Sequence, residues 1–172
     1  MKKKIFFDAE IVNPLNLTPK TKEILTKIGL PEEAPPSLAF DSHHDYGGLK
    51  LIDLYKGIPE TFSPYIWIGA TSAGDLICIN ENNENIVFLN HEIEDNPKEI
   101  FINSSIVEFI EFLSIYENFI ENIQKVNGGK AYIEGNAPND MLEELKNKFL
   151  SIDNKALLDR TFWIYELKHY YI

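Results

Sequence analysis

The chain is 44% hydrophobic and 25% charged, which is typical of a globular protein with a buried core and excludes a disordered chain. Its length of 172 residues is that of a single domain, so we expect one domain over residues 1–172. Its formal net charge is −11, and residues 29–123 hold seventeen acidic residues against three lysines. Nucleic-acid binding requires clustered Lys and Arg, so the acidic charge argues against a nucleic-acid partner and favours a basic protein partner. The alternative interpretation is that the acidic residues only keep the protein soluble.

The amino terminus, MKKKIFF, begins like a signal peptide, but Asp8 and Glu10 interrupt the apolar region that such a peptide needs. No apolar run is long enough to span a membrane. We therefore expect a cytoplasmic protein with no membrane contact, present as a monomer or weak homodimer. Residues 5–7 fit a short edge strand, and residues 13–17 fit a loop.

A helix is predicted to begin at Thr18-Pro19, because threonine favours the N-cap and proline the first helical position, and to end at Gly29. Its small apolar face consists of Ile24, Leu25 and Ile28. Residues 30–36, LPEEAPP, contain three prolines and are predicted to form a stiff connector without regular structure. Strands are predicted at residues 37–40 and 49–55, with a turn or loop at 43–48 between them.

The centre of the chain contains four short apolar runs that are rich in β-branched and aromatic residues and bounded by turn residues, which predicts strands. They are residues 65–68, 76–79, 86–89 and 100–102. The first two connections are too short for a crossover helix, so the neighbouring strands must be antiparallel. Because the runs are apolar rather than cleanly alternating, we expect both faces of this meander to be covered.

The longest predicted helix begins at Ser105, ends near Lys125 and is followed by Asn127-Gly128-Gly129. Ser105 and Glu108 match a capping box, in which the two side chains satisfy backbone donors of the first turn. Apolar residues recur at three- and four-residue spacing, so one face of the helix is expected to lie across the sheet. The residues of this face are Ile106, Phe109, Ile110, Leu113, Tyr116, Ile120 and Ile123, widened by Phe112, Ile115 and Phe119.

Beyond this helix, residues 131–133 fit a short strand or extended segment. Asn139 or Asp140 is predicted to cap a helix that runs to about Leu150, with Leu142, Leu145 and Phe149 facing the core. In the tail, residues 154–172, the apolar positions 163, 164, 167 and 171 share a helical face, so helix is favoured there, although the run TFWIY also fits a strand.

Four motifs follow one another along the chain: GLPE at residues 29–32, IG with GDLICI over 68–79, VFLNH at 87–91, and FINSS at 101–105. Their order and spacing over about residues 24–120, with a tryptophan near the end (Trp163), resemble the SUKH superfamily, specifically its fourth subgroup of bacterial immunity proteins. One departure is ATSA at residues 70–73, between the glycines, which leaves the turn type open.

This resemblance implies an α+β fold, with an antiparallel sheet of about five to six strands and helices at the amino terminus and in the carboxy-terminal half. It also implies a protein without catalytic residues, and we expect neither a cofactor nor a metal. Members of the family bind the toxin domain of a polymorphic secretion system, often a nuclease. We therefore expect a cytoplasmic immunity protein that binds and neutralises a cognate toxin domain, and the charge of this chain predicts that the toxin domain is basic.

Several motif residues have local structural explanations. Gly69 and Gly74 flank a hairpin connection, where a positive φ is easy for glycine, and Asp75 is expected to hydrogen-bond within that turn. At the strand-to-helix junction the short polar side chains of residues 103–105 are expected to cap backbone donors: Asn103, Ser104 and Ser105. The single cysteine, Cys78, excludes an internal disulfide and is expected to be a small buried hydrophobe.

An enzyme is the alternative from a different class. His43-His44-Asp45 is the only cluster in the sequence that looks like metal ligands, and it would serve a small metal-dependent hydrolase, but a third or fourth ligand is not evident. His91-Glu92 begins a zinc-protease motif, yet position 95 is aspartate instead of the required histidine. A further alternative is an intracellular protein-binding adaptor.

Acidic side chains gather in the turns of the meander and are our candidates for partner binding. They are Glu81, Glu84, Glu92, Glu94, Asp95 and Glu99. The alternative interpretation is that they are ordinary solvated turn residues.

Overall fold

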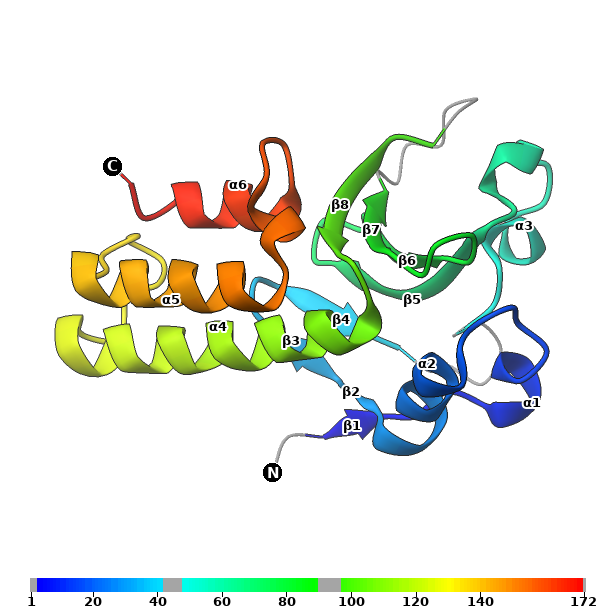
Figure 1. Ribbon diagram of the computed structural model, residues 1–172, viewed down its shortest axis with the longest axis horizontal. Helices are drawn as coiled ribbons and strands as arrows, with labels where there is room; N and C mark the ends of the chain where they lie inside the picture. Colours follow the sequence, from blue (N-terminus) through cyan, green and yellow to red (C-terminus); the bar gives the residue numbers. More distant parts are fainter. Residues whose placement is uncertain (1–2, 42–47, 90–96, 172) are drawn as a thin grey trace.

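The computed structural model describes residues 3–41, 48–89 and 97–171. Figure 1 shows a curved sheet, a layer of three helices (α4, α5 and α6) that extends away from it, and a smaller amino-terminal unit below the sheet. The predicted α+β class with an antiparallel sheet is confirmed. The strands are β1 (Lys4–Ile5), β2 (Leu30–Pro31), β3 (Glu33–Ala34), β4 (Leu38–Phe40), β5 (Tyr65–Thr71), β6 (Leu76–Asn80), β7 (Ile86–Leu89) and β8 (Glu99–Asn103).

The helices differ widely in length, and the two longest lie in the carboxy-terminal half. They are α1 (Ala9–Val12), α2 (Pro19–Glu23), α3 (Leu51–Leu54), α4 (Ile106–Asn127), α5 (Asn139–Ile152) and α6 (Phe162–Lys168). A π-helical segment, η1 (Ile24–Ile28), continues α2, and two 3-10 turns complete the set: η2 (Glu60–Phe62) and η3 (Asn154–Leu157).

The six-stranded sheet has the order β3-β4-β5-β6-β7-β8, and all neighbouring pairs are antiparallel. The predicted meander is therefore confirmed as β5 to β8. Its register places Trp67 opposite Cys78 and Ile79 opposite Ile86, with a bulge between Trp67 and Gly69. Strands β1 and β2 form a separate two-stranded sheet.

Both faces of the meander are covered, as its apolar runs predict. Ile66 and Ile68 of β5 belong to the main core, whereas Tyr65 and Trp67 of the same strand belong to or pack against a smaller core on the other side. This alternation follows from the two-residue period of a strand. All five residues of β6 are buried, Cys78 included, so burial raises the pKa of its thiol and the cysteine acts as a small hydrophobe.

The beginning of helix α4 packs on the sheet. Phe109 contacts Phe40 of β4, with ring centroids 5.8 Å apart. One turn later Phe112 stacks on Phe149 of α5, and the Tyr116 ring contacts Trp163 of α6. The expectation that the apolar face of α4 lies across the sheet is thus correct for its first turn. From Phe112 onward this face contacts α5, which Figure 1 shows lying alongside α4, and also Trp163 of α6.

The amino-terminal helix follows its sequence signals. Thr18 is the N-cap of α2, Pro19 occupies the first turn, and Gly29 ends η1 with φ of +79°. Ile28, expected on the apolar face, is instead 38% exposed, because the π-helical turn rotates the last residues relative to an α-helix.

Three secondary-structure predictions are wrong. The LPEEAPP segment contains the short strands β2 and β3, because β1 and β4 offer backbone partners that local sequence does not reveal. Residues 49–55 form the helix α3 in place of a strand, which lays Leu51 into the smaller core. Residues 131–133 lie in turns between Gly128 and Gly135, both with positive φ.

The carboxy-terminal elements agree more closely. Helix α5 buries Leu142, Leu145 and Phe149 as predicted, although Pro138, not Asn139 or Asp140, precedes its first turn. The favoured helix in the tail is present as α6, preceded by η3. Position 171 is exposed, however, and the tyrosine at position 170 is the buried one.

Candidate partner-binding surface

The FINSS motif ends in a buried polar network. Asp153, after the last turn of α5, accepts hydrogen bonds from the Ser104 backbone N–H (2.7 Å), the Ser104 hydroxyl (3.0 Å) and the Asn103 Nδ2 amide (3.3 Å). The Asn103 Oδ1 accepts a hydrogen bond from the Trp163 indole N–H at 3.0 Å. Asn103 and Ser104 therefore join the sheet to α5 and α6, which is a larger role than the helix cap that sequence alone predicts.

Ser105 fills the predicted capping position of α4. Its hydroxyl accepts a hydrogen bond from the Val107 N–H at 3.1 Å and donates one to the Glu108 carboxylate. A capping box would direct the serine and glutamate side chains to backbone donors of residues 108 and 105. Here the two side chains bond to each other, and only one backbone donor is satisfied by Ser105.

The glycines of the second motif are required for two different reasons. Gly74 has φ of +90°, as expected for a hairpin turn, and the Asp75 N–H donates to the Thr71 hydroxyl within that turn. Gly69 does not have a positive φ. A Cβ atom there would lie 2.6 Å from the Ala39 carbonyl oxygen and 2.9 Å from the Phe40 ring, so Gly69 allows β4 to approach β5 closely.

Glu81, a candidate for partner binding, is engaged inside the molecule. Its carboxylate accepts hydrogen bonds from the Lys50 ammonium at 2.6 Å and from the Asn16 N–H at 2.8 Å. Partial burial by itself would raise the pKa of Glu81, but these two donors outweigh it and the pKa is lowered. The residue joins the β6–β7 turn to the amino-terminal segment.

Glu84, in the same turn, binds the start of α2. Its carboxylate accepts hydrogen bonds from the Thr18 N–H (2.7 Å), the Thr18 hydroxyl (2.9 Å) and the Thr21 hydroxyl. Glu99 accepts from the Tyr65 hydroxyl (2.6 Å) and the Asn80 amide (2.7 Å). Burial and, second to it, the Glu99 carboxylate raise the pKa of Tyr65.

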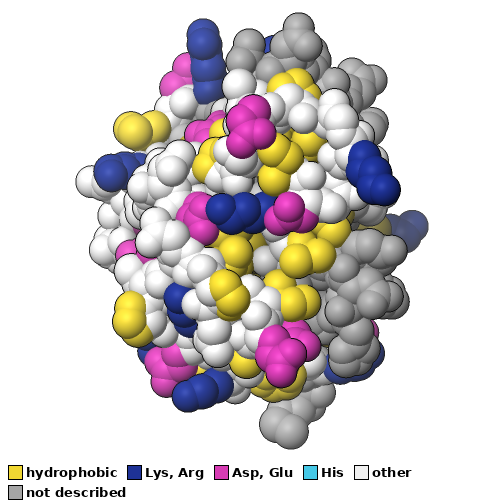
Figure 2. All heavy atoms as spheres, turned by 90° about the vertical axis from the view of Figure 1, so that its right-hand side faces the viewer, with side chains coloured by type: hydrophobic (Ala, Val, Ile, Leu, Met, Phe, Trp, Pro, Cys, Tyr) yellow, Lys and Arg dark blue, Asp and Glu magenta, His cyan; other side chains and the backbone are white. Residues whose placement is uncertain are grey.

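Three of the six acidic candidates thus form hydrogen bonds that join parts of the fold. Local sequence patterns do not indicate these bonds, because the partners lie far along the chain. The other three, Glu92, Glu94 and Asp95, lie outside the described residues. Figure 2 shows the face that carries α1, α2 and α3: hydrophobic side chains gather in its middle, and acidic and basic side chains both surround them. The described part of that face is therefore mixed in charge.

A second cluster of titratable groups lies where α6 meets the turns after α4. The Tyr116 and Tyr170 hydroxyls are 3.1 Å apart, and the His169 Nε2 lies 2.9 Å from the Tyr132 carbonyl oxygen. Burial raises the pKa of the neighbouring Glu166 to about 7, and the His169 ring opposes this shift only in part. The carboxyl of Glu166 therefore titrates near neutral pH.

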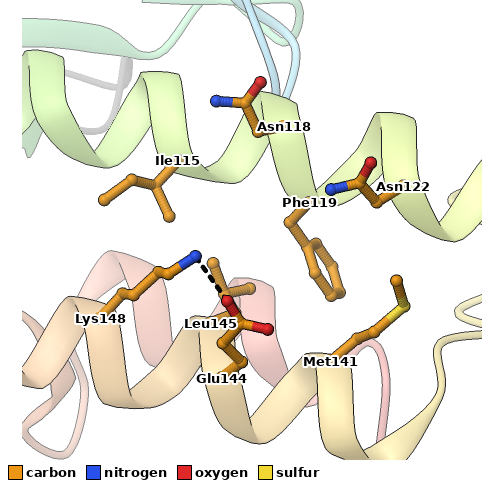
Figure 3. Close-up of a pocket in the computed structure, with 8 residues that line it drawn as sticks. All are labelled: Ile115, Asn118, Phe119, Asn122, Met141, Glu144, Leu145 and Lys148. Atoms are coloured by element: carbon orange, nitrogen blue, oxygen red, sulfur yellow. Dashed lines mark ion pairs between the residues drawn. The ribbon is translucent and has the colours of Figure 1, made fainter.

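A groove of about 100 Å³ runs between α4 and α5. Figure 3 shows Ile115 and Phe119 of α4 facing Met141 and Leu145 of α5 across it. Its polar lining consists of Asn118 and Asn122 on α4 and of the ion pair Glu144–Lys148 on α5, 2.7 Å long. The groove thus combines apolar side chains at its base with a polar lining of similar extent, and protein contacts also combine the two.

Among residues 3–41, 48–89 and 97–171, no group of three or more His, Cys, Asp or Glu side chains is arranged to hold a metal ion. The metal candidates His43, His44 and Asp45 fall outside those ranges, as does the His91-Glu92 pair. Within the same ranges no helix combines the length and apolar character that crossing a bilayer requires.

Comparisons with curated proteins and with solved structures find no match. The model of the SUKH-4 immunity protein family matches residues 4–167, which is nearly the whole chain. Members of this family are immunity proteins, which supports a role in toxin immunity and suggests a non-enzymatic one. The resemblance seen in the four motifs is thereby confirmed, and the chain belongs to the SUKH-4 immunity protein family.

Proposed function

We propose that this protein acts in the cytoplasm as one immunity domain, over residues 1–172, which binds a basic toxin domain and blocks it by occlusion, without catalysis. The proposed toxin is an effector of a polymorphic toxin system such as a nuclease. A nuclease must hold phosphates and therefore presents clustered Lys and Arg, which an acidic protein complements.

The observation that carries this proposal is the family match over residues 4–167. The net charge of −11 supports the sign of the partner's charge. Electrostatic attraction of this kind mainly accelerates association, whereas the strength of the complex depends on buried contacts.

We assign the steering of a basic partner to Glu92, Glu94 and Asp95, since Glu81, Glu84 and Glu99 already accept hydrogen bonds within the fold. The latter three still add negative charge to the field that a partner meets at a distance. Their substitution would confuse binding with folding, whereas the first three provide the cleaner test.

The experiment begins with the neighbouring genes, where a secreted-toxin gene directly upstream would supply the toxin domain, which is then produced in an inactive form. We expect a one-to-one complex with the immunity protein in sedimentation, and protection of cells that express the active toxin. No complex and no protection with that domain would contradict the proposed function.

Charge reversal tests the steering. Replacing Glu92, Glu94 and Asp95 by lysine should slow association, and raising the salt concentration should slow the wild type more steeply than this variant, with dissociation changed much less. Stopped-flow binding at two salt concentrations measures both rates. Equal association rates and equal salt dependence would mean that these three side chains do not steer the partner.

A further inference from the structure

The groove between α4 and α5 has no evident role in the packing of the core. Its floor is apolar, with Phe119 and Leu145 buried and Ile115 partly exposed. Its rim residues Asn118 and Asn122 are exposed. A groove with apolar side chains at its base and exposed amides at its rim can receive a partner side chain and exchange hydrogen bonds with the chain around it.

The size of the groove limits what it can hold. Sites for small organic ligands are typically about 300–1,000 Å³, and a cavity of about 150 Å³ accommodates benzene. The groove, at about 100 Å³, is smaller than either. It is large enough for one aliphatic side chain of another protein and smaller than a typical site for a metabolite.

The charge of the two helices indicates the surroundings of that side chain. Helices α4 and α5 together carry seven acidic residues and three lysines, a net charge of −4. Glu108 and Glu111 precede Ile115 by seven and four residues, so they lie along the same side of α4 as the groove. Glu111 is exposed, and its carboxylate is available to a cation at the end of the groove.

We propose that this groove receives one aliphatic side chain of the toxin domain, and that a lysine or arginine beside it on the toxin contacts the carboxylates of α4. The inference rests on the proposed function and names the surface that performs it. The amides of Asn118 and Asn122 pair with the toxin backbone around the inserted side chain, because an amide offers both a donor and an acceptor. The Glu144–Lys148 pair forms the opposite wall.

Two pairs of matched variants test the proposal. Asn118→Trp places a bulky ring at the rim of the groove, and Asn147→Trp makes the same change at an exposed position of α5 that does not line it. Glu111→Lys reverses the charge beside the groove, and Glu143→Lys does so at an exposed position of α5 outside it. Circular dichroism and thermal unfolding verify that all four variants fold.

We expect Asn118→Trp to weaken binding of the inactive toxin domain by at least about ten-fold, and Glu111→Lys to weaken it by about three- to ten-fold, while both controls stay within about two-fold of wild type. Titration calorimetry measures the affinities. If the wild type binds and all four variants bind equally well, the groove is not the interface and the proposed function stands. If the wild type itself does not bind, the proposed function fails and the groove assignment fails with it.

A second copy of the chain is the other conceivable occupant. Sedimentation of the immunity protein alone decides this point: a dimer that Asn118→Trp dissociates and Asn147→Trp preserves would overturn the assignment to the toxin. A wild type that sediments as a monomer at the concentrations of the binding experiment agrees with it.

Discussion

Asp153 and Glu84 make nearly the same hydrogen bonds in two different regions of the molecule. Asp153 accepts from the backbone N–H and the hydroxyl of Ser104, 49 residues away, and Glu84 accepts from the backbone N–H and the hydroxyl of Thr18, 66 residues away. Each carboxylate receives one more donor, the Asn103 amide and the Thr21 hydroxyl respectively. The two sites therefore differ little in their bonding pattern.

They differ in burial. Asp153 is 6% exposed and lies beside the aromatic cluster around Trp163, which is fully buried and contacts Phe112 and Phe149. The bonds from Glu84 to Thr18 are exposed. Water can replace a lost acceptor at an exposed site and cannot reach a buried one, so equal hydrogen bonds have unequal effects on stability. We therefore expect the hydrogen bonds of Asp153 to contribute more to stability than those of Glu84.

The largest expected effect is that of Asp153→Ala. It removes the acceptor of the buried Asn103 amide and of the partly buried Ser104 N–H and hydroxyl, and should lower the free energy of unfolding by about 3 kcal/mol. Denaturant unfolding of the wild type and the variant measures this difference. Asp159→Ala, at an exposed position, is the control and should change stability by less than about 0.5 kcal/mol. A loss for Asp153→Ala below about 1 kcal/mol would break the comparison, because burial would then add nothing.

Glu166 extends the comparison to a carboxyl whose burial is less well compensated. Burial raises the pKa of Glu166 to about 7 in the folded protein, above its ordinary value of 4.5. The folded state therefore binds more protons than the unfolded state between these values. The stability contributed by the protonated carboxyl is complete below about pH 4.5 and is lost as the pH rises through about 7.

Glu166→Gln should remove this loss. The variant should be more stable than the wild type at pH 8, by on the order of 2 kcal/mol, and show a much smaller gain at pH 5. Unfolding titrations at the two pH values test the sign. The same difference between variant and wild type at both would show that Glu166 is ionised throughout and that its burial does not affect its protonation.

Glu84→Ala should have a smaller effect, about 1.5 kcal/mol, since water takes over part of what the carboxylate provides to Thr18 and Thr21. Glu84→Gln keeps one acceptor oxygen and should lose less. Hydrogen exchange of the first α2 amides shows whether the loss of stability is confined to α2. A confined loss is expected if the amino-terminal segment can open without unfolding the rest of the protein. If Glu84→Ala is as damaging as Asp153→Ala, the amino-terminal segment is anchored as firmly as the carboxy-terminal half.

Local signals in the sequence were sufficient for much of the fold. Turn residues and apolar runs identified β5 to β8, and Thr18-Pro19 identified the start of α2, because each signal lies within a few residues of the element it determines. Residues 49–55 were predicted as a strand because of their apolar character. They form a helix instead, in which Leu51 is buried in the smaller core among residues distant in the sequence.

The polar anchors and the groove were beyond local signals. Asp153 follows a predicted helix, a position where aspartate is commonly exposed to solvent. Only the folded structure shows that it lies next to Ser104. Glu84 has the appearance of a turn residue, although its partners lie 63 and 66 residues away. The groove could not be predicted without knowing that α5 packs beside α4. Ile115 was expected on the widened apolar face of α4, and Leu145, which lies across the groove from it, was expected in the core.

The smallest expected effect is that of Ser105→Ala, one residue from the buried network and yet outside it. The substitution removes the hydrogen bond to the Val107 N–H and the contact with Glu108, and should cost about 1 kcal/mol of stability, the usual value for an N-cap. Ser114→Ala, in the exposed middle of the same helix, is the matched control and should be neutral or slightly stabilising, because alanine is the better helix former. Denaturant unfolding of both variants measures the difference, and Ser105→Asp should recover most of it, since aspartate is also a good N-cap. If Ser105→Ala instead lowers the free energy of unfolding as much as Asp153→Ala does, Ser105 must contribute to the buried network, which then extends from Asn103 to Ser105 and does not end at Ser104.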